Sequence, residues 1–291
     1  MHFQKWQALG NDYIVIEQDE LGFRLRPASI RLLCQAHFGV CADGVLVLSR
    51  SANPEIVADL SIYNPDGSEA ELSGNGAREA ILYLRHRGWT DKDIFSIKTA
   101  AGVITPTITG PNTCRVDMGK AALTSKDFPT GQSDGRGELM VDRQVFHFQH
   151  VSIGNPQCAI RVSEFDELES LNIPAIGRAI ERNALFPNRT NVSWYYKTPP
   201  TESAPNHISA RIFERGVGPT LSSGTGAIGA AVAHYLSGGA DLGHLVTVGL
   251  PGGELEVEVG EDLRINLTGE AHLVFEGTLG EDFLKELDET Q

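Results

Sequence analysis

Two short segments of the sequence place a serine directly before a glycine-rich turn. Residues 73–76 read Ser-Gly-Asn-Gly, and residues 223–226 read Ser-Gly-Thr-Gly. A serine at such a place caps a helix with its hydroxyl, and free backbone N–H groups lie beside it at the positive end of the helix dipole. Each segment therefore predicts an anion site. One segment alone would indicate only a capped helix start; the pair in register indicates a function.

The two segments belong to a longer internal repeat. At an offset of 150 residues, residues 62–80 match residues 212–230 with six identities, where chance would supply about one. An offset of 144 aligns Gly10 and Asn11 with Gly154 and Asn155. This period indicates a duplicated domain, because solenoid repeats are only about 20 to 50 residues long. The alternative, that two glycine-rich loops are alike in composition alone, stays open.

A duplicated anion site suggests a particular chemistry. If two such sites faced one another across a cleft, each would hold part of one carboxylate, and the neighbouring carbon would lie between Ser73 and Ser223. Inverting that carbon requires a proton to leave one face and another to arrive on the opposite face. Donors already aimed at the carboxylate would stabilise the intermediate carbanion. The repeat therefore predicts a racemase or epimerase.

Short β-type runs outnumber helical patterns, which predicts a mixed α/β (α+β) fold. The predicted strands are residues 12–17, 45–48, 60–63, 94–99, 150–153, 208–213, 245–248, 255–259 and 271–275. The predicted helices are residues 27–37, 76–87, 174–182 and 226–236. Ala77, Ala80, Ile81 and Leu84 form one stripe, which is typical of a helix packed on a sheet.

Length and composition narrow the class of protein. A chain of 291 residues that is 41% hydrophobic is long enough for two domains. We expect one at residues 1–120, completed by residues 270–291, and one at residues 121–269, with a joint in the polar segment 124–137. A net charge of −14 argues against nucleic acid or a membrane as partner and favours a small molecule. The start of the chain resembles no signal peptide, and four cysteines fit reduced thiols, so we expect a cytoplasmic protein.

Seven segments, in order along the chain, resemble signature segments of the diaminopimelate epimerase family. They are residues 9–13, 34–44, 63–69, 154–156, 186–192, 214–218 and 251–255. The resemblance implies two pseudo-symmetric domains, each a mixed, barrel-like sheet around a central helix, with the active site between them. It also implies an enzyme that interconverts LL- and meso-diaminopimelate by two-base proton transfer without pyridoxal phosphate, metal or another cofactor. The amino-acid substrate would be a precursor of lysine, and the partner a second copy in a homodimer.

The resemblance also implies roles for single residues. Ser73 and Ser223 stand where the family carries its two catalytic cysteines, and Glu214 could activate Ser223. Arg215 could pair with a carboxylate of the substrate and Glu214 with an ammonium group, and a diamino-dicarboxylate carries both kinds of group. The residues expected to bind substrate are Asn11, Asn64, Gly74, Asn75, Asn155, Asn191, Glu214, Arg215, Gly224 and Thr225.

Five positions depart from the family pattern: Ser73 and Ser223 replace cysteines, and Gln157, Glu79 and Cys41 differ as well. A serine hydroxyl is far less acidic than a thiol and needs an adjacent base. Gln157 stands where the family usually has histidine, and an amide cannot take the proton. Glu79 replaces a small residue or cysteine, and we expect it to face solvent. Cys41 replaces a glycine.

These departures leave three explanations. The chain is a serine branch that still epimerises diaminopimelate or a related amino acid. Alternatively, it binds an amino acid and is inactive or performs another isomerisation. A deliberate replacement of both cysteines is the third, and Gln157 and Glu79 argue against it.

Two further motifs suggest other functions. Residues 224–229 spell G-x-G-x-x-G, which raises the hypothesis of an NAD-binding oxidoreductase. A dinucleotide site needs the glycines directly after a strand. Here the preceding predicted strand ends near Glu214, too far upstream of the first glycine, Gly224. Cys34, His37 and Cys41 lack a fourth zinc ligand, so we expect core thiols and a histidine that positions a loop.

Overall fold

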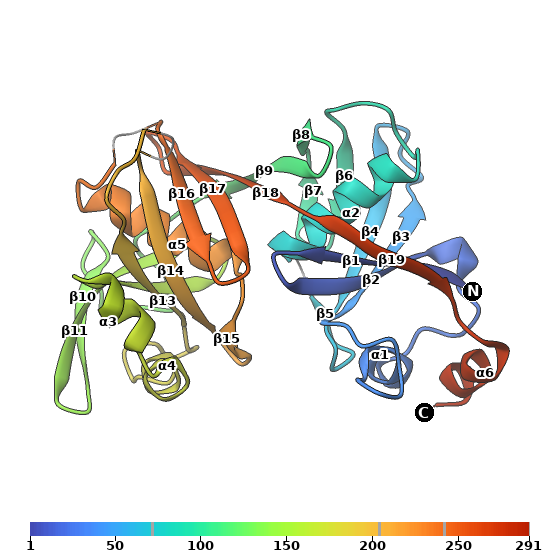
Figure 1. The fold of residues 1–291 in the computed structure, drawn as a ribbon, viewed down its shortest axis with the longest axis horizontal. Coiled ribbons are helices and arrows are strands. Elements are labelled where there is room, and N and C mark those ends of the chain that lie inside the picture. Colours follow the sequence, from blue (N-terminus) through green and yellow to red (C-terminus); the bar gives the residue numbers. More distant parts are fainter. Residues whose placement is uncertain (71–72, 203–204, 241–242, 291) are drawn as a thin grey trace. The chain divides into compact units, whose positions relative to one another are not determined.

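The chain folds into two units that are each built around one buried helix (Figure 1). A computed structural model describes residues 1–70, 73–202, 205–240 and 243–290. Unit 1 comprises Met1–Val116 and Gly269–Gln291, and unit 2 comprises Asp117–Thr268. Strands exceed helices in both units, which confirms the predicted mixed α/β class.

Unit 1 contains a mixed sheet in the order β19-β1-β2-β3-β4-β6-β7, with β5 beside β4. Only β2 with β3 and β4 with β6 pair in parallel among the described strands of this sheet. The last strand pairs with the first, so the end of the chain completes unit 1. The strands are β1 (His2–Ala8), β2 (Asn11–Glu17), β3 (Val45–Arg50), β4 (Ile56–Tyr63), β5 (Glu69–Ala70), β6 (Ser96–Thr99), β7 (Gly102–Ile104) and β19 (His272–Thr278).

Unit 2 repeats this arrangement. Its sheet runs β10-β11-β12-β13-β14-β16-β17-β18-β9-β8, with β15 beside β14. β12 pairs in parallel with β13, and β14 with β16, as β2 does with β3 and β4 with β6 in unit 1. The strands are β8 (Thr107–Gly110), β9 (Thr113–Lys120), β10 (Arg136–Val141), β11 (Gln144–Ser152), β12 (Pro156–Arg161), β13 (Asn191–Lys197), β14 (His207–Glu214), β15 (Gly218–Thr220), β16 (Leu245–Leu250), β17 (Gly253–Val259) and β18 (Arg264–Glu270). The boundary between the units falls within β9, so β8 and the first residues of β9 extend this sheet although they are counted with unit 1.

The helix α2 (Gly74–His86) is buried on every side for most of its length. It packs against β1, β2, β3 and β19, and all residues from Asn75 to Leu84 are buried. The helix α5 (Gly224–Leu236) is enclosed in the same way by β11 to β14, β16 and β17. A sheet wrapped around a central helix is therefore present in each unit, as the resemblance implied.

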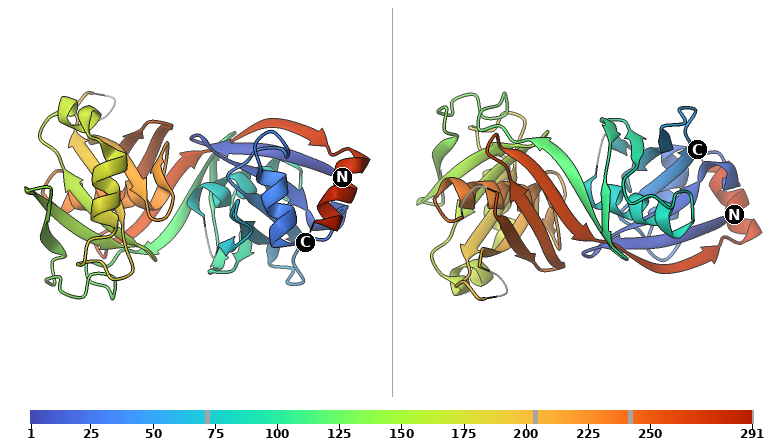
Figure 2. Two further views of the ribbon diagram at one scale, coloured as in Figure 1. Left: turned by 90° about the horizontal axis from the view of Figure 1, so that it is seen from below. Right: turned by 90° about the horizontal axis from the view of Figure 1, so that it is seen from above.

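The remaining helices cover the outside of the sheets. In unit 1, α1 (Pro27–Cys34) lies beside α6 (Glu281–Glu289), as the left view of Figure 2 shows. In unit 2, α3 (Phe165–Ser170) and α4 (Ile173–Glu181) cover β13 and β14, and a short η1 (Gln18–Glu20) follows β2 in unit 1. No helix within the described ranges is long and apolar enough to cross a membrane.

Segment 124–137, which the polar sequence predicts to be a joint, lies within unit 2 and is attached to its core through Phe128. Phe128 is 5% exposed and packs against Phe148 and Phe186, with ring centroids 5.3 and 5.6 Å away. Gly131 lies so close to the Phe128 ring that a Cβ there would be 2.4 Å from Cδ1. One aromatic residue among many polar ones is enough to anchor the segment.

Candidate active site

Ser73 caps the central helix of unit 1. Its backbone is extended, at φ −125° and ψ 124°, and its Oγ accepts the N–H of Gly76 at 3.1 Å. The same oxygen accepts a second hydrogen bond from the hydroxyl of Tyr13 on β2, at 3.2 Å. The local sequence predicts the cap, because serine followed by glycines leaves the first N–H groups of the helix exposed to its hydroxyl.

Ser223 caps the central helix of unit 2 in the same manner. Its Oγ accepts the N–H of Gly226 at 3.3 Å, and the residue is 5% exposed. Gly226 must be glycine, because a Cβ there would lie 2.7 Å from Cδ1 of Ile212. The predicted serine cap is therefore present at both helix starts.

A side-chain contact that joins the first loop of each unit to its central helix is repeated. In unit 1 the amide of Asn75 donates to Oδ1 of Asn11 at 3.1 Å. In unit 2 the amide of Asn155 donates to Oγ1 of Thr225 at 3.2 Å. The two sequence offsets, 144 and 150, thus meet at one equivalent contact in each unit, which argues against chance similarity of the loops.

A chain of hydrogen bonds fixes the amides of unit 1. Arg78 is fully buried and donates from Nη2 to Oδ1 of Asn75 at 2.6 Å and from Nη1 to the Gly74 carbonyl at 3.1 Å. Asn75 therefore presents its N–H group to Asn11, whose own amide donates to Oδ2 of Asp43 at 2.8 Å. Sequence reasoning missed Arg78 and Asp43, although an arginine four residues after Gly74 on the same helix was a usable signal.

Glu79 is buried, and the prediction that it faces solvent was wrong. The residue is 0% exposed because the sheet encloses α2 on all sides, and neither carboxylate oxygen has a hydrogen-bond partner among the described residues. Burial raises the pKa of Glu79 well above its usual range, and the neighbouring Arg78 opposes this rise. Burial lowers the pKa of Arg78 in turn. Glu79 is thus a buried carboxylic acid one helical turn beyond Asn75.

Asn64 directly follows β4, and Glu214 is the last residue of the equivalent strand β14. The Asn64 amide donates to Oγ of Ser68 at 3.0 Å, across the turn that follows β4. Oε1 of Glu214 accepts the hydroxyl of Thr220 at 3.4 Å, across the hairpin of β14 and β15. The chain runs from β14 through this hairpin to α5. Glu214 lies at the start of this connection and Ser223 at its end.

Asn191 and Arg215 hold two loops of unit 2 together. Oδ1 of Asn191 accepts the backbone N–H of Arg215 at 2.9 Å, and its amide donates to the Pro156 carbonyl at 3.0 Å. Nη1 of Arg215 donates to the Asn188 carbonyl at 3.1 Å. Asn191 is 5% exposed, and its buried side-chain amide hydrogen-bonds to the backbone of both loops.

Gln157 lies beside the Asn155–Thr225 contact. Its amide donates to Oδ1 of Asn155 at 2.7 Å, and its own carbonyl oxygen is buried without a partner among the described residues. A Cβ at Gly229 of α5 would lie 2.8 Å from Cβ of Gln157. Glycine at this position therefore makes room for the glutamine.

The zinc and dinucleotide motifs do not form the sites that they suggest. Within the described ranges no group of three or more His, Cys, Asp or Glu side chains could hold a metal ion. Cys34 is buried, and burial raises the pKa of its thiol to about 12, whereas Cys41 is exposed and is not the core thiol that we expected. The glycines of residues 224–229 open α5, but β15 separates them from β14.

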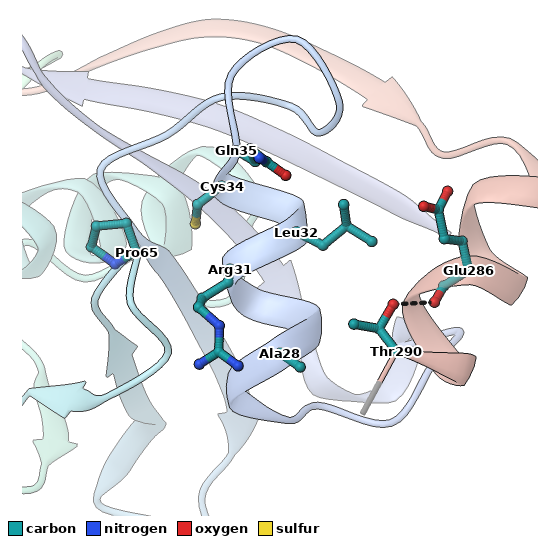
Figure 3. A pocket seen from close by; sticks show the side chains of 8 residues that line it. All are labelled: Ala28, Arg31, Leu32, Cys34, Gln35, Pro65, Glu286 and Thr290. Carbon is teal, nitrogen blue, oxygen red and sulfur yellow. Dashed lines mark hydrogen bonds between the residues drawn. The ribbon is translucent and has the colours of Figure 1, made fainter.

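A hollow on unit 1 is lined by none of the predicted site residues. Its volume is about 670 Å³, and Arg31 and Cys34 of α1 line it together with Pro65, Glu286 and Thr290 (Figure 3). Arg31 donates from Nη1 to the Asp66 carbonyl at 3.0 Å. The hollow therefore touches the turn after Asn64 from its outer side.

Known proteins match the chain over almost its whole length. A family model described as diaminopimelate epimerase matches residues 3–124 and 149–274. A diaminopimelate epimerase of Desulfitobacterium hafniense is 39% identical over 98% of this chain and 100% of its own length. Diaminopimelate epimerase 2 of a Nostoc species is 36% identical over 96% of this chain and 95% of its own.

Solved structures share the fold at low sequence identity. A probable proline racemase from Agrobacterium radiobacter with bound carbonate gives a TM-score of 0.69 at 15% identity and covers 97% of this chain and 93% of its own. A phenazine biosynthesis protein of the PhzF family from Bacillus anthracis gives 0.66 at 19% identity, with coverage of 96% and 99%. These two proteins therefore share the fold of this chain.

Proposed function

Because the chain belongs to the diaminopimelate epimerase family, we propose that it is an isomerase that interconverts LL- and meso-diaminopimelate. The observation that carries the proposal is the repeated helix start, in which Ser73 and Ser223 each cap a buried helix. One group on each unit is what a two-base inversion of a single carbon requires.

The N–H groups at these helix starts suit the α-carboxylate of the substrate. Gly74 and Asn75 begin α2, and Gly224 and Thr225 begin α5, so both starts carry backbone donors at the positive end of a helix dipole. Removing the α-hydrogen moves negative charge into the carboxylate, and donors already in place stabilise that charge. This chemistry needs neither a metal nor pyridoxal phosphate.

The serines would act as the acid and base on the two faces of the α-carbon. A serine hydroxyl needs help from a neighbouring group to accept or replace a proton. We propose that Glu214, held by the Thr220 hydroxyl, activates Ser223. The substrate's amino and distal groups would be recognised by Asn64, Asn191, Glu214 and Arg215. Asn11 would lie near the α-carboxylate, and Asn155 is a further substrate-binding residue.

Turnover of the pure stereoisomers tests this function. LL- or meso-diaminopimelate is incubated with enzyme, and the two isomers are separated on a chiral column. We expect conversion in both directions, with kcat at least about 100-fold lower for Ser73→Ala, Ser223→Ala and Glu214→Gln, because positioned acids and bases contribute such factors. The matched control is Ser237→Ala at the far end of α5, where Oγ donates to the His234 carbonyl at 2.7 Å.

A binding protein, or an enzyme for another isomerisation, is the second candidate, favoured by the low acidity of serine and by Gln157. Binding of diaminopimelate without any conversion by the wild-type protein would support this alternative and contradict the first. We also propose a cytoplasmic homodimer, which fractionation and sedimentation of the protein would test.

A further inference from the structure

Two donors converge on the hydroxyl oxygen of Ser73. The Gly76 N–H and the Tyr13 O–H both end on Oγ, at 3.1 and 3.2 Å. A serine oxygen has two lone pairs and one proton of its own. With both lone pairs occupied, the serine proton is free to point away from the protein backbone and toward a substrate.

The position of the Tyr13 ring is built into the sheet. The ring is 5% exposed, and Trp6 of β1 stands opposite it in the ladder. Gly44 makes space for the ring, because a Cβ there would lie 2.5 Å from its Cε1 atom. The hydroxyl of Tyr13 is therefore held at Ser73 by packing rather than by a flexible loop.

Among the described residues of unit 2 the contact has no counterpart. At the offset of 144 that relates Asn11 to Asn155, Tyr13 corresponds to Gln157, whose amide donates to Asn155 instead. The hydrogen bonds among described residues bring only the Gly226 N–H to Oγ of Ser223. The two serines thus differ in the group that could exchange a proton with them.

We propose that Tyr13 is a positioning residue that relays protons through Ser73. This inference rests on the proposed function, in which Ser73 faces the α-carbon. When Ser73 protonates the carbanion, its O–H bond breaks and the carbanion's electron pair forms the new Cα–H bond. Oγ then takes the Tyr13 proton, and the phenolate recovers one from water.

In the reverse direction the Tyr13 phenolate takes the proton of Ser73 while Oγ removes the α-hydrogen, and the electron pair of the broken Cα–H bond stays on the carbon. The relay makes chemical sense because a phenol ionises near pH 10, whereas an aliphatic hydroxyl is a far weaker acid. Tyr13 would therefore act on Ser73 as an adjacent general base acts on a weakly acidic hydroxyl nucleophile.

Tyr13→Phe tests the relay in two backgrounds. In the wild-type enzyme we expect kcat to fall about 10- to 100-fold in both directions, which is the cost of losing a hydrogen bond to a charged group, with KM changed less than about threefold. The dependence of kcat on pH should change shape as well. In a Ser73→Cys enzyme the same substitution should lower kcat less than about threefold, because a thiol at a helix start ionises without the phenol.

Tyr83→Phe is the matched control, since Tyr83 is another buried tyrosine of unit 1 whose hydroxyl donates to Glu17 at 2.8 Å. It should leave the pH profile of kcat unchanged. An equal loss of kcat from Tyr13→Phe in both backgrounds would overturn the relay, because only a structural role acts alike on serine and thiol.

The Ser73→Ala enzyme separates the two proposals. If Ser73→Ala abolishes turnover while Tyr13→Phe leaves kcat and its pH profile unchanged, the relay is wrong and the proposed function stands. If Ser73→Ala leaves turnover unchanged, the proposed function fails and the relay fails with it.

Discussion

The side-chain amide of Asn75 donates to Oδ1 of Asn11 at 3.1 Å, although 64 positions separate the two residues in the sequence. The same contact recurs in unit 2 between Asn155 and Thr225, at 3.2 Å. In unit 1 a buried arginine, Arg78, continues the chain behind Asn75, whereas the equivalent position at the offset of 150 is Ile228. The two units therefore share this side-chain contact, but a charged group supports it in unit 1 through Arg78.

This difference predicts unequal effects on stability. Asn75→Ala should lower the free energy of unfolding by about 2 to 4 kcal/mol, because it removes an acceptor from the buried Arg78 guanidinium. Thr225→Val removes one neutral hydrogen bond and should cost about 1 kcal/mol. Urea unfolding followed by circular dichroism measures both values. Equal losses would contradict the supporting role of Asn75 toward Arg78.

Cysteine at the two serine positions should increase the rate. A thiol has a pKa of about 8.5 that a helix start lowers further, so it exchanges a proton more easily than a hydroxyl. We expect the double variant Ser73→Cys/Ser223→Cys to raise kcat at least about 10-fold. Ser237→Cys on α5 controls for the added thiol and should leave kcat unchanged. A fall in kcat of the double variant would show that the site is adapted to oxygen.

Because the pKa of Glu79 is raised in the folded state, we expect the free energy of unfolding to fall as pH rises. Its folded-state pKa lies above the unfolded value of about 4.3, so the folded state keeps a proton that the unfolded state has lost. The contribution is present below about pH 4.3 and is lost as pH rises through the folded pKa. The groups that act on it are Arg78, Asp12, Asp43 and the backbone of Tyr13.

Glu79→Gln, which cannot ionise, is the variant to compare. The unfolding free energy of the wild-type protein, measured from pH 4 to 9, should fall relative to that of Glu79→Gln as pH rises. A constant difference between the two proteins across this range would show that Glu79 has the same pKa in both states.

The sequence predicted those features that depend on neighbouring residues. The four predicted helices are present as α1, α2, α4 and α5, and α2 and α5 begin directly after Ser73 and Ser223, because cap chemistry is local. Predicted strands such as residues 208–213 extend by a residue or more, and Ile94 and Phe95 precede β6 rather than belonging to it. Strands without a clear alternation, such as β1 and β13, were missed.

Other features depend on contacts that no local pattern reveals. Glu79 is charged, and the single apolar stripe on α2 led to the prediction that it faces solvent. The closure of the sheet around the helix buries both Glu79 and Arg78. The contact of Tyr13 with Ser73 joins residues 60 positions apart. The aromatic anchor Phe128 within a polar segment is missed for the same reason.

The fate of the α-hydrogen tests the two-base account most directly. LL-diaminopimelate is incubated in D₂O with the wild-type enzyme, and both isomers are recovered after a few per cent of conversion and analysed by NMR and mass spectrometry. Two acid–base groups predict meso product with deuterium at the inverted carbon and remaining LL substrate that still carries hydrogen, since the group that removes the hydrogen is not the one that returns it. Deuterium in the remaining substrate at this stage, or hydrogen retained in the product, would contradict the assignment of separate roles to Ser73 and Ser223.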